Sequence, residues 1–217
     1  MPVDFTLDRS TDNYGVMGNP VAHSKSPQIH LAFAAQCGQR LHYQAILVEP
    51  SGFARALDEF QRQGGKGLNV TVPFKEDAYR AVSIRTKRAD RAGAVNTIWF
   101  GEGGESHGDT TDGTGLIRDL RRNGVKLENR LVLILGAGGA VRGVLGDLTG
   151  ERPQRVVLAN RTIERAGELL RRFADTPCDM AVSRFSDLKG SRFDVIVNGT
   201  SLSLQGELPP LPDGILA

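Results

Sequence analysis

A strand-like run that breaks into a glycine-rich turn constrains the fold of this chain more than any other feature. Five apolar residues, 131–135, are followed directly by five small ones: Gly136, Ala137, Gly138, Gly139 and Ala140. A buried parallel strand that turns through glycines into a helix leaves backbone amides and the positive end of the helix dipole pointing at one place. The pattern therefore predicts a turn that suits a pyrophosphate.

A second run, residues 155–159, is apolar after its first residue and indicates which dinucleotide such a turn would bind. An NAD site usually carries Asp or Glu at the end of this strand, whereas an NADP site offers positive charge to a 2′-phosphate. Here the strand is followed by Asn160, Arg161 and Thr162, and Arg165 lies one helical turn later. Because a planar guanidinium donates paired bonds to phosphate oxygens, the two arginines favour NADP over NAD.

The glycine turn also has a simpler interpretation. Val141 stands where the third glycine of a GxGxxG pattern would be, and a glycine-rich turn alone is a weak signal. Taken singly, the turn fits a plain strand-to-helix connection as well as a cofactor site. Ala140 and Gly143 still permit close packing, and the arginine pair shifts the balance toward the cofactor site.

The composition excludes several classes of protein. The chain has 217 residues, 40% of them hydrophobic and 24% charged, which is ordinary for a soluble globular protein of one large or two small domains. No run approaches the roughly 20 apolar residues of a membrane-spanning helix. The N-terminal residues lack the pattern of a secretory signal, so we expect a cytoplasmic protein without a membrane partner. A net charge of +2, with Asp119 among Arg118, Arg121 and Arg122, argues against nucleic-acid binding.

The cysteines and histidines predict no metal site. Cys37 and Cys178 form no CxxC pair, so we expect two small buried hydrophobic side chains rather than a disulfide or a zinc site. The four histidines show no metal-ligand spacing.

Alternating strand-like and helix-like segments predict an α/β fold. In the first half we expect strands over 14–17, 43–47, 67–72 and 94–100, and helices over 27–37, 53–63 and about 78–88. This alternation indicates a parallel sheet. A helix over 115–122 would link the halves. The second half predicts strands starting near 131, 155, 179 and 193, with helices over about 140–148 and 163–173. Four strands are fewer than a six-stranded dinucleotide sheet needs.

Polar residues stand at unusual positions in the first half. In GNPVAHSKSP, Ser26 before Pro27 fits a helix N-cap, but the cap leaves Ser24 unexplained. Two hydroxyls at the beginning of a helix would suit a small carboxylate. Lys75 in NVTVPFK follows a strand, where ligands of α/β proteins bind, although a lone lysine is usually solvated. Asp112, taken alone, reads as a turn or cap residue.

Six strings in this order carry a resemblance: GNPVAHSKSP, NVTVPFK, AGAVNT, TTDG, GAGGA and NRT. Together they resemble shikimate dehydrogenase, from about residue 14 to residue 212. The resemblance implies an N-terminal α/β substrate domain, residues 1–112, and a Rossmann-type NADP domain, residues 113–217, with the active site in the cleft between them. The implied reaction is the reversible reduction of 3-dehydroshikimate to shikimate by NADPH, a step in making aromatic amino acids.

The resemblance also implies roles for single residues. Ser24 and Ser26 would hold the substrate carboxylate, Lys75 would be the acid/base, and the ring hydroxyls would bond to Thr71, Asn96 and Asp112. The implied cofactor residues are Gly136, Ala137, Gly138, Gly139, Ala140, Asn160, Arg161, Thr162 and Arg165. An ammonium beside the reduced ketone can stabilise the developing charge and deliver a proton, and a neighbouring carboxylate can hold that ammonium in position.

The sequence departs from the family in several places. Family members continue beyond the NGTS segment into a strand and helices, so the Rossmann domain is expected to be incomplete and the chain to be a fragment. Thr110 stands where Asn is frequent, and Lys87 stands where an acidic residue is common. Two alternatives remain open: a quinate or shikimate dehydrogenase of altered specificity, and a non-catalytic binding module. As partners we expect only the small-molecule substrate, in a monomer or homodimer.

Overall fold

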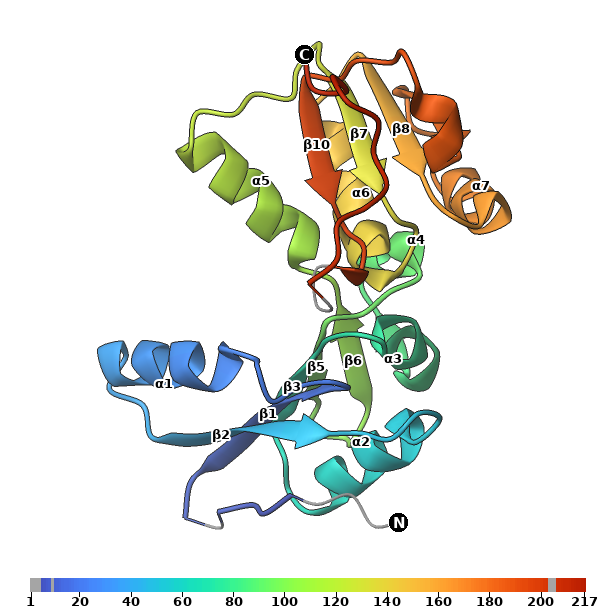
Figure 1. Cartoon of the computed structure of the whole chain (residues 1–217). Coiled ribbons are helices and arrows are strands. Elements are labelled where there is room, and N and C mark those ends of the chain that lie inside the picture. Colours follow the sequence, from blue (N-terminus) through green and yellow to red (C-terminus); the bar gives the residue numbers. More distant parts are fainter. Residues whose placement is uncertain (1–4, 9, 203–205) are drawn as a thin grey trace. The chain divides into compact units, whose positions relative to one another are not determined.

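The computed structural model describes residues 5–8, 10–202 and 206–217, and the chain divides into two compact units. The first unit comprises residues 1–110 and the second residues 111–217. The division therefore lies two residues before the domain boundary that we predicted after Asp112. Figure 1 labels helices and strands of both units.

The described part of the first unit contains a six-stranded sheet in the order β2-β1-β3-β5-β6-β4. Its strands are β1 Asp12–Gly18, β2 Leu41–Leu47, β3 Gly67–Val70, β4 Ile84–Arg85, β5 Thr97–Phe100 and β6 Ser106–Asp109. Strand β1 runs parallel to β2 and β3, whereas β5 runs antiparallel to both β3 and β6. The sheet is thus mixed, and the prediction of a parallel sheet is wrong for this unit, because β5 and β6 form a hairpin.

Four helices cover the two faces of this sheet: α1 Ser26–Gln36, α2 Phe53–Arg62, α3 Lys75–Ala81 and α4 Lys87–Ala92. One face carries the main core, in which Met17 and Ile46 of the sheet pack with Phe53 and Phe60 of α2 and with residues of α3 and α4. The other face carries a smaller cluster of Val16, Val21 and Tyr43, and α1 contacts β1 and β2. Figure 1 shows α1 and α2 on opposite sides of β2.

One predicted helix of this unit is wrong. The helix expected over 78–88 is interrupted: α3 ends at an extended Val82, strand β4 follows, and α4 begins after Thr86, whose hydroxyl accepts the Ala89 amide. A β-region residue before a helix that accepts such a bond is a new N-cap, so a second helix begins there. Strand β6 was not predicted.

The second unit contains, in its described residues, a four-stranded sheet in the order β10-β7-β8-β9. Its strands are β7 Leu131–Leu135, β8 Arg155–Ala159, β9 Asp179–Ser183 and β10 Val195–Asn198, and all three pairs are parallel. Its helices are α5 Asp112–Arg122, α6 Gly139–Gly150, α7 Ile163–Arg171 and the short 3-10 helix η1 Phe185–Leu188. This parallel α/β arrangement confirms the predicted Rossmann-type order of elements.

Different elements cover the two faces of the second unit's sheet. Residues of α5, α6 and α7 pack with Val132, Ile134, Val156 and Leu158 on one face. On the other face, Leu133 and Leu135 pack with Leu188 of η1 and with Ile215, near the end of the chain, which crosses this face in Figure 1. Alternate residues of one buried strand therefore serve two cores, as its continuous apolar run indicates.

The prediction of two buried cysteines is not confirmed. Cys37, just after α1, is exposed rather than buried, and Cys178 is partly buried; both are free thiols. Among the described residues, no helix is long and apolar enough to cross a membrane. The same residues contain no group of three or more side chains that could hold a metal ion.

Candidate active site

One edge of the first unit's sheet collects most of the predicted substrate residues. Strands β1 and β3 are parallel neighbours, with Met17 opposite Val70, so the segments that follow them leave the same edge of the sheet. The antiparallel β5 begins at this edge, because Thr97 pairs with Asn69. The edge therefore gathers the loop after β1, the start of α3 and the residue before β5. These segments carry Ser24, Ser26, Thr71, Lys75 and Asn96.

The two serines lie together at the beginning of α1. Their hydroxyl oxygens are 3.2 Å apart, and the Ser26 amide donates to Oγ of Ser24 over 3.3 Å. Ser26 is the first residue of the helix rather than its N-cap, a position held by Lys25 without a side-chain cap bond. The cap prediction is thus wrong by one residue. Both hydroxyls instead lie beside the first-turn amides, where a carboxylate is favoured.

Tyr43, Asn69 and His30 extend this polar group, and sequence reasoning assigned them no role. The Tyr43 hydroxyl donates to Oδ1 of Asn69 over 2.7 Å, and the His30 ring stacks on the Tyr43 ring with 4.4 Å between centroids. Tyr43 is buried, which raises the pKa of its phenol, while a hydrogen bond with Ser26 acts in the opposite direction. Burial also lowers the pKa of His30. Each group therefore favours its neutral form.

Thr71 is held close to the end of β1. Its amide donates to the Met17 carbonyl over 2.9 Å, and a Cβ at Gly18 would lie 2.3 Å from its methyl carbon. Only glycine at position 18 leaves Thr71 this space. The structure thus explains why a glycine ends β1.

Asn96 is buried and fixed through its backbone. Its carbonyl accepts the Val70 amide over 2.8 Å, and its own amide donates to the Asp109 carbonyl over 2.9 Å. Its side-chain oxygen accepts the Thr97 hydroxyl over 2.8 Å. These bonds tie Asn96 to β3 and to the end of β6.

Lys75 and Asp112 begin helices in different units. Lys75 is the first residue of α3 and is partly buried, and its carbonyl accepts the Val95 amide over 2.9 Å. Asp112 is the first residue of α5 in the second unit. In that unit a Cβ at Gly113 would lie 2.6 Å from Oδ2 of Asp147 on α6, so α5 and α6 approach closely just after Asp112. The first unit thus groups the other predicted substrate residues, and Asp112 is positioned by the packing of the second.

The glycine turn has the backbone geometry that a phosphate needs. Gly136 has a φ of +103°, and its amide donates to the Ala159 carbonyl over 2.8 Å. A Cβ there would lie 3.1 Å from the Gly199 carbonyl, whereas a Cβ at Gly138, the N-cap of α6, would meet nothing within 4 Å. Since α6 has no acidic residue in its first turn, its amides and open backbone fit a pyrophosphate. Gly139 and Ala140 begin that first turn, and Ala137 in the preceding loop is buried.

The predicted 2′-phosphate residues follow β8. The Asn160 amide group donates to the Thr162 carbonyl over 2.7 Å, which closes the loop before α7. Arg161 and Arg165 are both exposed. Asn160 and Thr162 therefore shape the loop, and the arginines supply its positive charge.

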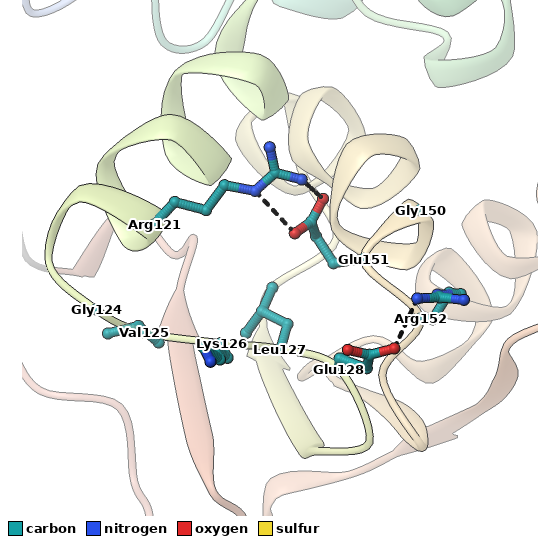
Figure 2. A pocket seen from close by; sticks show the side chains of 9 residues that line it. All are labelled: Arg121, Gly124, Val125, Lys126, Leu127, Glu128, Gly150, Glu151 and Arg152. Atoms are coloured by element: carbon teal, nitrogen blue, oxygen red, sulfur yellow. Dashed lines mark hydrogen bonds and ion pairs between the residues drawn. The ribbon is translucent and has the colours of Figure 1, made fainter.

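A cavity of about 470 Å³ lies at the other end of α6 and is unrelated to this turn. Figure 2 shows two ion pairs among its charged side chains. Arg121 donates to Glu151 over 2.7 Å, and Arg152 donates to Glu128 over 2.6 Å. Because the 12 residues of α6 span about 18 Å, a ligand there would not touch the glycine turn.

Comparisons with known proteins agree for both units. The profile of the shikimate dehydrogenase substrate binding domain matches residues 16–98, and that of shikimate / quinate 5-dehydrogenase matches residues 119–205. The NADP(+) shikimate dehydrogenase of Alkalilimnicola ehrlichii is 56% identical over 95% of this chain and 76% of its own length. That of Cellvibrio japonicus is 50% identical over 95% of this chain and 74% of its own.

Solved structures show the same likeness. Shikimate dehydrogenase from Aquifex aeolicus is 34% identical, with a TM-score of 0.84 over 96% of this chain and 76% of that one. The Thermus thermophilus enzyme, solved with NADP(H) and shikimate, is 33% identical, with a TM-score of 0.81 over 94% of this chain and 75% of that one. This chain belongs to the shikimate dehydrogenase family.

Proposed function

We propose that this chain catalyses the reversible reduction of 3-dehydroshikimate to shikimate with NADPH. One observation supports this most directly: the edge of the first unit's sheet gathers hydroxyls, an amide and an ammonium, which are the groups needed to bind a hydroxylated ring acid. The curated relatives at 50–56% identity are NADP(+)-dependent shikimate dehydrogenases.

The polar residues at this edge bind two different parts of the substrate, its carboxylate and its ring hydroxyls. The paired hydroxyls of Ser24 and Ser26, 3.2 Å apart, bind the carboxylate at the beginning of α1. Thr71 and Asn96 bind ring hydroxyls, and their tight backbone bonds fix these side chains before substrate arrives.

Lys75 carries the proton transfer. Reduction of a ketone places negative charge on its oxygen, which an adjacent ammonium stabilises and then protonates. Asp112 binds a ring hydroxyl. In the reverse direction, the neutral amine of Lys75 accepts the proton of the alcohol.

The second unit binds the dinucleotide. When bound, NADPH supplies the hydride that reduces the carbonyl carbon. The amides of Gly138, Gly139 and Ala140 receive the pyrophosphate, while Arg161 and Arg165 receive the 2′-phosphate. Because both arginines are exposed, they are accessible to this phosphate.

The partners that we propose are the two small molecules alone, with no membrane or nucleic acid. A cytoplasmic location and a monomeric or homodimeric state remain predictions. Gel filtration with light scattering tests the second of these.

The experiment that tests the function mixes the purified chain with NADPH and 3-dehydroshikimate and follows the absorbance of NADPH. Parallel reactions contain NADH in place of NADPH, or run from shikimate or quinate with NADP. Consumption of NADPH that depends on 3-dehydroshikimate and is lost in Asp112→Asn supports the proposal. Equal rates with quinate and shikimate would support the relative of altered specificity, and binding without turnover would support the non-catalytic module.

A further inference from the structure

Arg184 directly follows the strand beside the one that leads to Arg161. Strands β8 and β9 are parallel, with Ala159 opposite Ser183, and the Asn160 amide donates to the Ser183 carbonyl over 3.1 Å. Neighbouring strands lie about 5 Å apart. The residues that leave the two strands, Asn160 and Arg184, therefore start side by side at the same edge of the sheet.

The alternation of β9 places Arg184 on the face that α7 covers. Met180 and Val182 pack against the cluster that contains Ala166 and Leu169 of α7. Arg184 continues the extended backbone, with φ −83° and ψ 158°, so a period of two residues puts it on the same face. Helix α7 begins at Ile163 on this face and contacts both β8 and β9.

The two ends of this strand pair differ in their charge. At the amino end, Arg155 of β8 pairs with Asp179 of β9 over 3.3 Å. At the carboxyl end, Arg161 and Arg184 are exposed, and neither side chain makes an ion pair or hydrogen bond within the described residues.

Few acids oppose this charge. The nearest in the chain are Glu164, in the first turn of α7, and Asp187, whose carboxylate accepts the Ser186 hydroxyl. Arg165 lies in the same first turn of α7, so the residues near this end include three arginines and two carboxylates. The carboxyl end therefore keeps a net positive charge that attracts an anion.

We infer that Arg184 is a specificity-determining residue that binds the 2′-phosphate of NADP together with Arg161. This inference rests on the proposed function of the second unit. A doubly charged phosphate accepts bonds from several guanidinium groups at once, and Arg184 approaches it from a neighbouring strand rather than from the loop after β8. The 3-10 helix that begins just after Arg184, with the Asp187 amide donating to the Arg184 carbonyl over 3.2 Å, fixes its backbone.

Calorimetric titration with adenosine 2′,5′-bisphosphate and with 5′-AMP tests this without nicotinamide, substrate or turnover. The two ligands differ only in the 2′-phosphate. We expect Arg184→Ala to weaken binding of the bisphosphate on the order of tenfold, as for loss of one charge-assisted bond, and to leave 5′-AMP binding unchanged. Arg184→Lys should recover part of the loss. Arg171→Ala, in the last turn of α7, removes the same charge at the other end of that helix and should change neither affinity.

The outcomes separate this inference from the cofactor assignment. If Arg161→Ala loses the preference for the bisphosphate while Arg184→Ala retains it, the role of Arg184 is wrong and NADP binding stands. If the unaltered chain binds both nucleotides equally, the NADP assignment itself fails, and the role of Arg184 with it. Circular dichroism of each variant shows whether a loss of affinity reflects unfolding.

Discussion

Arg88 donates hydrogen bonds from two nitrogens to the carboxylate of Asp109, the last residue of β6. Its Nε donates to Oδ1 over 2.7 Å, and its Nη2 donates to Oδ2. Oδ1 also accepts the Thr86 hydroxyl over 2.6 Å and the Thr110 amide over 2.8 Å. One side chain thus joins the beginning of α4 to the end of β6.

This carboxylate lies next to the proposed substrate residues. The Asp109 carbonyl accepts the amide of Asn96, so the same residue fixes α4 through its side chain and Asn96 through its backbone. Burial alone raises the pKa of Asp109, but the bonds from Arg88, Thr86 and Thr110 outweigh it, and the net pKa is lowered. The folded state therefore favours the charged form.

Asp109→Asn should destabilise the first unit. The amide keeps an acceptor but loses the charge and places an NH₂ group beside a guanidinium. We expect the free energy of unfolding at neutral pH to fall by about 1–3 kcal/mol, as for loss of hydrogen bonds to a charged group. Urea denaturation of the original chain and the variant measures this difference.

The same pair predicts a pH dependence. A lowered folded pKa stabilises the fold above the unfolded pKa of about 3.9, and this stability is lost as the pH falls through the folded value. The difference in the free energy of unfolding between the original chain and Asp109→Asn should therefore shrink below about pH 4. In an Arg88→Ala background, Asp109→Asn should lower the free energy of unfolding by less than it does in the original chain. An equal loss of stability in both backgrounds would show that the two residues are not coupled.

Lys75→Ala should abolish most turnover and leave NADPH binding intact, because in the proposed mechanism its ammonium acts on the substrate oxygen. We expect kcat to fall on the order of 100- to 10,000-fold, the usual contribution of general acid–base catalysis. Lys66→Ala is the matched control, since Lys66 is exposed just before β3, at the opposite end of that strand from Thr71. Unchanged turnover in Lys75→Ala would remove this residue from the mechanism.

Tyr43→Phe tests the polar group around Ser26. The substitution keeps the ring that stacks on His30 and removes only the hydroxyl that donates to Asn69. We expect the KM for 3-dehydroshikimate to rise, kcat to change little, and stability to fall by about 1 kcal/mol for the unpaired amide oxygen. Tyr14→Phe, on the neighbouring strand β1, should leave KM unchanged. A fall in stability without a change in KM would restrict Tyr43 to a structural role.

Apolar periodicity predicted the second unit better than the first. Strands β7 and β8 begin at the predicted residues 131 and 155, because their apolar runs are bounded by turn residues. Strand β6 escaped prediction because its buried positions are Ser106 and Gly108 rather than apolar residues. A Cβ at Gly108 would lie 2.8 Å from the Val82 side chain, so close packing requires glycine at this position. Glycine contributes nothing to the apolar alternation by which a strand is recognised.

Within the site, motifs located residues but not their partners. The serines, Thr71, Lys75 and Asn96 stand in recognisable strings, and the sheet brings these strings to one edge. Tyr43 contacts a residue 26 positions away through its hydroxyl, and such a pairing depends on strand order, which spacing does not reveal. The exposure of Cys37 likewise depends on which side of α1 meets the sheet.

Gly138→Ala should separate cofactor binding from folding. Gly138 has φ −86° and ψ −173°, a conformation open to any residue, and an added Cβ meets nothing within 4 Å, so we expect an unchanged Tm. The methyl group would occupy the space that a pyrophosphate approaches, and we expect the Kd for NADPH to rise at least tenfold, about 1.4 kcal/mol. Gly150→Ala, at the last residue of α6 with equally open space, is the control and should leave the Kd unchanged. Gly136→Ala, at φ +103°, should instead lower the Tm. Tight NADPH binding by Gly138→Ala would place the pyrophosphate elsewhere than at this turn.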